Sequence, residues 1–234
     1  MKQYFNNLFF EDEEELKKQI IKKIKLQEKM FIVTANPETF MIGKKDNEFN
    51  HILLNENVTI VADGIGIIKA CKKLKIGIPN KITGIDLTYD LLVIANKNNY
   101  KIYLYGASEK VLQKLVKKIS NDYVNVDIIG FNHGYDQNDD NVIKKIVKGK
   151  PDIILVALGI PKQEKFINKC IKVCNKGIFI GVGGSFDNIS GYIKRAPKIF
   201  RKLNLEWLYR IITDPKRIKR FYQNNIKFLF NIKK

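Results

Sequence analysis

The chain has 234 residues, a length that suits one α/β domain with an appendage better than two independent domains. Its 45% hydrophobic and 28% charged residues exclude an intrinsically disordered chain, and its net charge of +18 favours polyanionic partners. No apolar run is long enough to span a membrane, and acids follow the short apolar patch near the N-terminus where a signal peptide would need a cleavage site, so we expect a cytoplasmic protein.

Six short β-branched and apolar runs recur along the chain, and a helix-like segment follows each of them. They lie at 30–34, 58–62, 101–105, 124–130, 152–158 and 177–181. The runs are nearly continuous rather than alternating, which is typical of strands covered on both faces. The first 190 residues therefore predict an α/β catalytic domain with a Rossmann-like, mainly parallel sheet of about six strands flanked by helices.

The pattern changes at the C-terminus, where helix-like segments continue without strands. From Lys194 onward the chain holds thirteen Lys or Arg residues against two acids, and Trp, Tyr, Phe and Leu alternate with the bases. Residues 191–234 thus predict a helical, basic, amphipathic appendage. Such a segment suits an anionic membrane surface, but interleaved bases and aromatics also suit a nucleic acid.

Two glycine-containing strand ends are candidate phosphate contacts. Gly106 follows the third strand and Gly183 follows the sixth, at the edge where parallel sheets bind ligands. Small residues there let backbone amides approach a phosphate closely. They equally permit tight turns between strand and helix, and the two interpretations remain open for each loop taken alone.

Asp63 ends the second strand and precedes a glycine. A carboxylate in this place can take a proton from an attacking hydroxyl group if partial burial raises its pKa. Aspartate is also a favoured helix N-cap, and on the residues alone capping is the more frequent role.

Other strand ends add polar groups. Thr34 and Asn36 follow the first strand and could bind a substrate hydroxyl group or cap the next helix, and Lys162 with Gln163 follows the fifth strand, where an anionic ligand would sit. His51 and His133 are the only histidines, the three cysteines have no metal-type spacing, and no Asp-x-Asp triplet occurs. We therefore expect no metal ion and no other cofactor.

Taken in order, the motifs TANPE, ADGIGI, ITGIDL, YGAS, ALGIPKQE, GVGGSFD, RAP and LEWLYRIITDPKRIKR resemble the WecG/TagA/CpsF glycosyltransferases, also called family 26. They run from about residue 30 to residue 222. The pattern is most similar to members of the TagA type, which transfer N-acetylmannosamine.

The resemblance implies an inverting hexosyltransferase that moves a sugar from a UDP-sugar donor to undecaprenyl-diphosphate-linked GlcNAc, in wall teichoic acid or related cell-surface polysaccharide synthesis. It assigns Asp63 as the catalytic base, with Thr34 in the catalytic group, and it assigns Asn36, Gln163 and Asp187 to substrate binding. Lys81 and the strand-end glycines Gly106 and Gly183 are further substrate-binding candidates. It assigns Arg195, Arg210, Arg217 and Arg220 to the lipid diphosphate and the membrane. The enzyme would then work as a peripheral protein at the inner face of the bacterial cell membrane.

One position departs from the family pattern. The family usually has arginine before the V/I-T-G triplet, where this chain has Lys81. Lysine keeps the charge but loses the bidentate fork, so the geometry of a diphosphate contact differs there.

Several alternatives stay open. The donor could instead carry N-acetylmannosamine uronic acid, glucose or glucuronic acid, and the basic tail could cover the crevice, the membrane or a second subunit of a homo-oligomer. A nucleic-acid-binding protein is the alternative outside enzymes, but it leaves the ordered strand-end motifs unexplained, and we expect no nucleic-acid partner.

Overall fold

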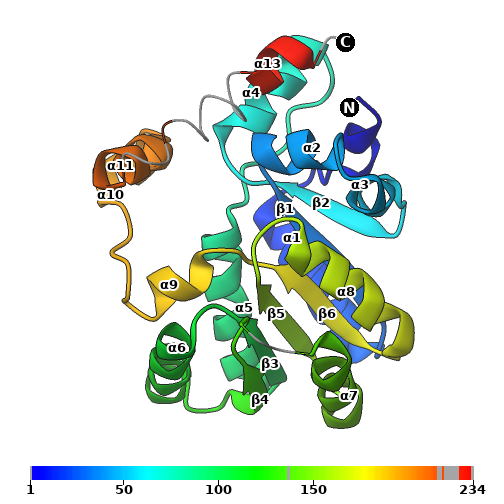
Figure 1. Cartoon of the computed structure of the whole chain (residues 1–234), viewed down its shortest axis with the longest axis vertical. Coiled ribbons are helices and arrows are strands. Elements are labelled where there is room, and N and C mark those ends of the chain that lie inside the picture. Colours follow the sequence, from blue (N-terminus) through cyan, green and yellow to red (C-terminus); the bar gives the residue numbers. More distant parts are fainter. Residues whose placement is uncertain (1, 136–137, 215–217, 219–226, 233–234) are drawn as a thin grey trace.

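The computed structural model describes residues 2–135, 138–214, 218 and 227–232, except for the side chains of residues 210, 229 and 231. Its centre is one six-stranded sheet in the order β2-β1-β6-β5-β3-β4, and every neighbouring pair is parallel (Figure 1). The strands are β1 (Lys29–Ala35), β2 (Val58–Ala62), β3 (Lys101–Gly106), β4 (Asp127–Asn132), β5 (Ile153–Ala157) and β6 (Gly177–Gly181). The predicted Rossmann-like α/β fold is confirmed.

The strands are buried on both faces, as their continuous apolar runs predict. All five residues of β5 and all five of β6 are buried. The edge strand β4 differs, because it is only half covered and begins at Asp127 instead of the predicted residue 124. Val124 is 77% exposed and precedes the strand, so its β-branched side chain alone misled the prediction.

Helices cover both faces of the sheet (Figure 1). One face carries η1 (Lys2–Asn7), α2 (Pro37–Gly43), α3 (Asn47–Leu54), α4 (Ile65–Leu74), α7 (Asp139–Gly149) and α8 (Lys162–Val173). The other carries α1 (Glu13–Lys25), α5 (Gly84–Asn98), α6 (Glu109–Asp122) and α9 (Ser185–Ile189). Alternate residues of β3 enter the two cores, since Tyr103 and Tyr105 face α7 and α8 whereas Ile102 and Leu104 face the opposite layer.

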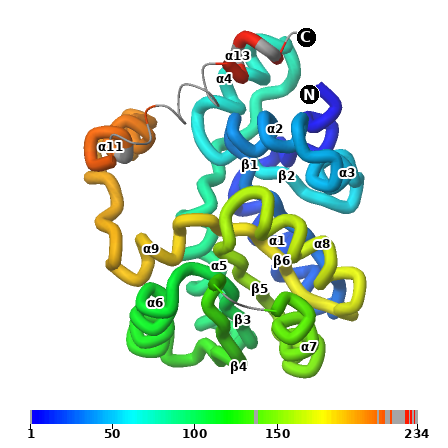
Figure 2. Tube along the Cα trace, viewed as in Figure 1, coloured from blue at the N-terminus to red at the C-terminus, as the bar shows by residue number. Residues whose placement is uncertain are grey.

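The C-terminal segment divides into two differently packed parts. Helices α10 (Lys198–Lys202) and α11 (Glu206–Thr213) lie away from the sheet and pack on each other through Phe200 and Tyr209, whereas α13 (Lys227–Asn231) returns to α2 and α4 (Figure 2). Phe228 and Ile232 are fully buried there, with the Phe228 ring 6.1 Å from that of Phe40. The described segments after residue 197 include the three helices α10, α11 and α13, and the last of these belongs to the core.

Within the part of the chain that the structure describes, no helix is both long and apolar enough to cross a membrane.

Candidate functional site

The strand order creates a crevice between β3 and β5. From β3 the chain runs outward through α6 on one face to β4, whereas from β5 it runs through α8 on the other face to β6. The connections therefore leave these two neighbouring strands in opposite directions, which is the point where open α/β sheets bind ligands. A cleft of about 890 Å³ lies at this point, lined by Tyr105, Ala107, Gly134, Tyr135, Asn138, Asp139, Asp140, Ala157, Leu158, Lys162, Lys165, Phe166 and Lys169.

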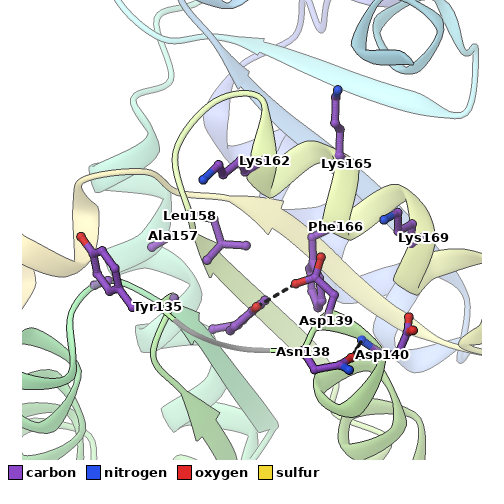
Figure 3. Close-up of a pocket in the computed structure, with 13 residues that line it drawn as sticks. Tyr135, Asn138, Asp139, Asp140, Ala157, Leu158, Lys162, Lys165, Phe166 and Lys169 are labelled. Carbon is purple, nitrogen blue, oxygen red and sulfur yellow. Dashed lines mark hydrogen bonds between the residues drawn. The ribbon is translucent and has the colours of Figure 1, made fainter.

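The cleft has a basic wall and an acidic wall. Figure 3 shows Lys165 and Lys169 on α8 across from Asn138, Asp139 and Asp140 at the start of α7. Lys165 is paired with Asp46 at 2.7 Å and with Glu48 at 3.2 Å, so much of its charge is neutralised. Lys162 and Lys169 are exposed and offer the cleft its ammonium groups. This wall can attract an anionic ligand.

Asp139 accepts a hydrogen bond from Tyr105, another residue that lines the cleft. The Tyr105 hydroxyl donates a hydrogen bond to Asp139 Oδ1 at 2.8 Å (Figure 3). Burial, and then this hydrogen bond and the charge of Asp139, raise the pKa of Tyr105 above its usual value. The tyrosine is therefore a neutral donor at physiological pH.

Asp63 lies at the other end of the same sheet edge, half-buried directly after β2. Its backbone N–H donates to Ala35 O at 2.8 Å, which extends the pairing with β1. The N-cap position of α4 is held by Gly64, with φ 98°, and not by Asp63. Asp63 therefore lies in the turn between β2 and α4. The carboxyl end of β2 is next to that of β1, and β1 is next to β6.

Lys81 is a neighbour of Asp63 through the backbone. The segment at Lys81 forms a parallel bridge with Ala62, and Ile82 N donates to Ala62 O at 3.0 Å. The Lys81 ammonium group is exposed and donates to Asn204 Oδ1 at 2.6 Å. The backbone of Lys81 therefore lies next to the candidate base, and its side chain reaches the loop between α10 and α11.

Thr34 and Asn36 hold the end of β1 in different ways. The buried Thr34 hydroxyl donates to Gly181 O at 2.9 Å and ties β1 to the end of β6. Asn36 Oδ1 accepts from the N–H groups of Glu38 and Thr39 and caps α2. The sequence left two roles open for Asn36, and in the structure its side-chain oxygen caps α2.

Gln163 and Gly183 are joined to each other. Gly183 N donates to Gln163 Oε1 at 3.1 Å, and Gln163 Nε2 donates to Glu164 Oε1 at 2.8 Å. Gln163 is buried and packs flat on Gly181, because a Cβ at that glycine would overlap the Gln163 amide. The sequence made the Gly183 amide a candidate phosphate contact, and in the structure this amide donates its hydrogen bond to Gln163.

Glu164 is the charged residue most deeply placed near this site. Its side chain has no exposed surface, and Oε2 has no hydrogen-bond partner among the described residues. Burial raises its pKa to about 7, although the hydrogen bond from Gln163 acts in the opposite direction.

Gly106 and Asp187 lie at the ends of β3 and β6. Gly106 has φ 126°, and a Cβ there would overlap the carbonyl of Ala157, so the glycine permits the close approach of β3 and β5. Asp187 is half-buried in α9, and its carbonyl oxygen accepts from Ile193 N at 2.9 Å. Gly106 stands two strands from β6, about 10 Å along the edge, and belongs to the cleft side of the site.

Arg195 is held by carboxylates of the protein. Its Nη2 donates to Asp86 Oδ1 at 2.7 Å, and its Nε lies 4.0 Å from Glu206 Oε1. The side chain of Arg210 and all of Arg217 and Arg220 fall outside the described residues, so their assignment to the lipid diphosphate stays a prediction.

The strand ends thus bring most predicted residues to one edge. Thr34, Gln163 and Gly183 are linked around the end of β6, and Asp63 and Lys81 adjoin them at β1 and β2. Sequence reasoning missed Asp86, Glu164 and Tyr105. For Asp86 a signal existed, because Thr83 and Asp86 form a Thr-x-x-Asp capping pattern before an apolar run.

The composition of the site bears on metal binding too. Among the residues that the structure describes, no group of three or more His, Cys, Asp or Glu side chains is arranged to hold a metal ion. Cys71, Cys170 and Cys174 are buried free thiols.

Comparison with known proteins identifies the family. The chain is 42% identical over 189 residues to an N-acetylglucosaminyldiphosphoundecaprenol N-acetyl-beta-D-mannosaminyltransferase of Bacillus subtilis (strain 168), covering 81% of this chain and 73% of the relative. A protein of the same name from Staphylococcus aureus (strain NCTC 8325 / PS 47) is 40% identical over 206 residues, 88% of this chain and 80% of the relative. The model of the glycosyl transferase WecG/TagA/CpsF family matches residues 5–234, and the chain therefore belongs to this family.

Proposed function

We propose that this chain transfers N-acetylmannosamine, with inversion and without a metal ion, from its UDP-activated form to undecaprenyl-diphosphate-linked GlcNAc. The observation that carries the proposal is the 42% identity, over 81% of the chain, to an enzyme named for transfer of this sugar to this acceptor. Wall teichoic acid synthesis or a related cell-surface polysaccharide pathway would use the product.

The geometry supports a single displacement along the carboxyl edge of the sheet. Asp63 would take the proton of the acceptor hydroxyl group as that oxygen attacks the anomeric carbon, and the configuration then inverts. The donor would extend from Asp63 at β2 toward the cleft at β5 and β3, a span of roughly 14 Å over three strand spacings. This span suits a nucleoside diphosphate joined to one sugar ring.

Positive charge and oriented amides would stabilise the leaving diphosphate in place of a metal ion. Lys162 lines the cleft, and the backbone of Lys81 pairs with Ala62 next to Asp63, so the ammonium groups of these two lysines are candidates for this role. Among the described residues, nothing crowds Gly183 in the loop after β6, but its N–H donates to Gln163, so an amide for the diphosphate would come from Gly184.

Peripheral membrane binding is supported by the surface of α10 and α11. Ile199, Leu203 and Ile212 are exposed on these helices beside Lys198 and Lys202. Apolar side chains can enter the interface while the bases remain among anionic headgroups. The lipid-linked acceptor would be reached from this surface at the inner face of the membrane.

The test is to incubate the purified protein with a panel of UDP-sugars and a short-chain lipid-diphosphate GlcNAc, with and without EDTA. We expect transfer from UDP-N-acetylmannosamine with the same rate in both conditions. Transfer from the donor that carries N-acetylmannosamine uronic acid, glucose or glucuronic acid instead would show that the proposed donor sugar is wrong. Loss of turnover on EDTA would refute metal independence, and tight oligonucleotide binding without any transfer would favour the nucleic-acid alternative.

A further inference from the structure

A buried carboxyl group sits behind the loop that follows β6. Glu164 is in the first turn of α8, its side chain has no exposed surface, and it contacts the amide of Gln163 through Oε1. Burying a carboxyl group costs free energy unless hydrogen bonds compensate, so its presence calls for a role. Neither the proposed chemistry at Asp63 nor the cleft uses it.

The Gln163 amide has one orientation that satisfies both of its neighbours. Its oxygen accepts from Gly183 N at 3.1 Å and its nitrogen donates to Glu164 at 2.8 Å. A rotation by 180° would turn the NH₂ group toward the N–H of Gly183 and leave two donors facing each other. The carboxyl group of Glu164 and the N–H of Gly183 therefore fix the same side chain from opposite ends.

The Gly183 loop depends on this side chain for its position. Gln163 fills the space over Gly181, whose carbonyl also accepts from Thr34, and it holds Gly183 in a left-handed conformation with φ 49°. Apart from its neighbours in the chain, no atom of the described residues lies within 4 Å of the place where a Cβ of Gly183 would be, so the loop is open on that side.

We propose that Glu164 is a positioning residue for the donor site, which holds the Gln163 amide and through it the Gly183 loop against which the donor diphosphate binds. The proposal rests on the proposed function in one respect, namely that the ligand of the loop is a UDP-sugar. Without Glu164, Gln163 Nε2 is buried without an acceptor, and the side chain relieves this cost by turning away from Gly183.

Two substitutions of similar size separate this role from simple packing. Glu164→Gln keeps an acceptor oxygen for Gln163, whereas Glu164→Met keeps the volume but has no such acceptor. Because methionine is favourable in a buried place, we expect both variants to fold. Glu164→Asp is one methylene shorter and moves the carboxyl group away from Gln163. It takes the place of Glu164→Met should that variant fail to fold.

The experiment measures the Kd of UDP by calorimetry, the KM values of donor and acceptor, and the hydrogen-exchange rate of the Gly183 amide without ligand. We expect Glu164→Met, and Glu164→Asp more weakly, to raise the Kd of UDP and the donor KM about 3- to 10-fold and to speed exchange at Gly183. Glu164→Gln should match the wild type, and the acceptor KM should not change.

A double-mutant cycle with Gln163→Met shows whether Glu164 acts through Gln163. We expect the combination with Glu164→Met to bind UDP no more weakly than Gln163→Met alone. Additive losses, or equal UDP affinity and Gly183 exchange in Glu164→Met and Glu164→Gln, would overturn the proposal. If the wild type neither binds UDP nor transfers sugar, the proposed function fails, and the exchange rates still decide whether Glu164 positions the loop.

Discussion

Arg195 and Asp86 form an ion pair across 109 residues of sequence, with 2.7 Å between Nη2 and Oδ1. Burial opposes the ionisation of Asp86, but hydrogen bonds from Thr83 and Arg195 and the charges of Arg195 and Arg201 outweigh it and hold the pKa of Asp86 below its usual value. The pair fastens the segment before α10 to the start of α5, next to the Lys81 and Asp63 backbone. A second contact, from Lys81 to Asn204, fastens the loop before α11.

Breaking this ion pair should loosen α10 and α11 more than the rest of the protein. In Arg195→Ala we expect faster proteolytic cleavage between residues 191 and 204, with a loss of global stability below about 1 kcal/mol because Asp86 is partly exposed. Arg195→Lys retains the charge and is the control. Cleavage at the wild-type rate in Arg195→Ala would show that the pair does not hold the segment.

Replacing the candidate base tests the chemistry directly. We expect Asp63→Asn to lower kcat about 10²- to 10⁴-fold, since the amide cannot take the acceptor proton, and to leave UDP binding intact. Steady-state assays with saturating donor and acceptor measure kcat, and calorimetry measures the Kd of UDP. Near-normal turnover in this variant would remove Asp63 from the role of base.

The buried carboxyl group of Glu164 predicts a pH dependence of stability. The folded state keeps this proton up to a pH of about 7, whereas the unfolded chain releases it near 4.5. The free energy of unfolding therefore falls as the pH rises from about 4.5 to 7, by roughly 3 kcal/mol from this group, and is level above.

Urea unfolding at several pH values checks the sign. Glu164→Gln lacks the group and should show a flatter profile between pH 5 and 7 than the wild type. Glu13, whose pKa burial and the neighbouring Asp90 raise to about 7, titrates in both proteins and cancels in the comparison. Parallel profiles of the two proteins would contradict the assignment.

The end of the chain should contribute to stability as a core element. Phe228 is fully buried against Phe40, and Phe228→Ala should cost about 3 to 5 kcal/mol in the free energy of unfolding. Phe230 is 75% exposed on the same helix, with the Lys73 ammonium group 5.9 Å from the centre of its ring, and Phe230→Ala, the matched control, should cost less than about 1 kcal/mol. Equal effects in urea denaturation would refute the packing of α13.

Membrane binding should depend on α10 and α11 without α13. Leu203→Ser and Ile212→Ser replace exposed side chains and should weaken sedimentation with anionic vesicles while the Tm stays unchanged. Val124→Ser, at an exposed site before β4, is the control and should bind as the wild type does. A truncation after Ala196 would remove the buried Phe228 as well, so point variants are the sharper test.

Local sequence patterns predicted the framework well. The apolar runs indicated all six parallel strands because burial on both faces requires continuous apolar residues. The glycine and polar residues after the strands predict the edge at which a ligand would bind. The start of β4 was shifted by three residues, since this edge strand is only half covered, whereas the other edge strand, β2, is mostly buried and has the predicted bounds.

The roles of single side chains were beyond the reach of these patterns. The patterns left capping open for Asn36 and did not predict the bond between Gln163 and Gly183 or the pair of Arg195 with Asp86, and the substrate roles that the resemblance assigns to these residues stay predictions. The order of the strands decides which of these groups meet, and that order is set by packing over the whole sheet.

The sequence by itself thus determined the family and the parallel α/β sheet, and it predicted the edge of the sheet at which the candidate residues gather. Tertiary structure alone decided that Glu164 stands buried behind Gln163 and that the end of a strongly basic tail inserts Phe228 into the core. The physical reason is that strand formation depends on neighbours along the chain, whereas burial and hydrogen-bond partners depend on residues that folding brings from 20 to more than 100 positions away.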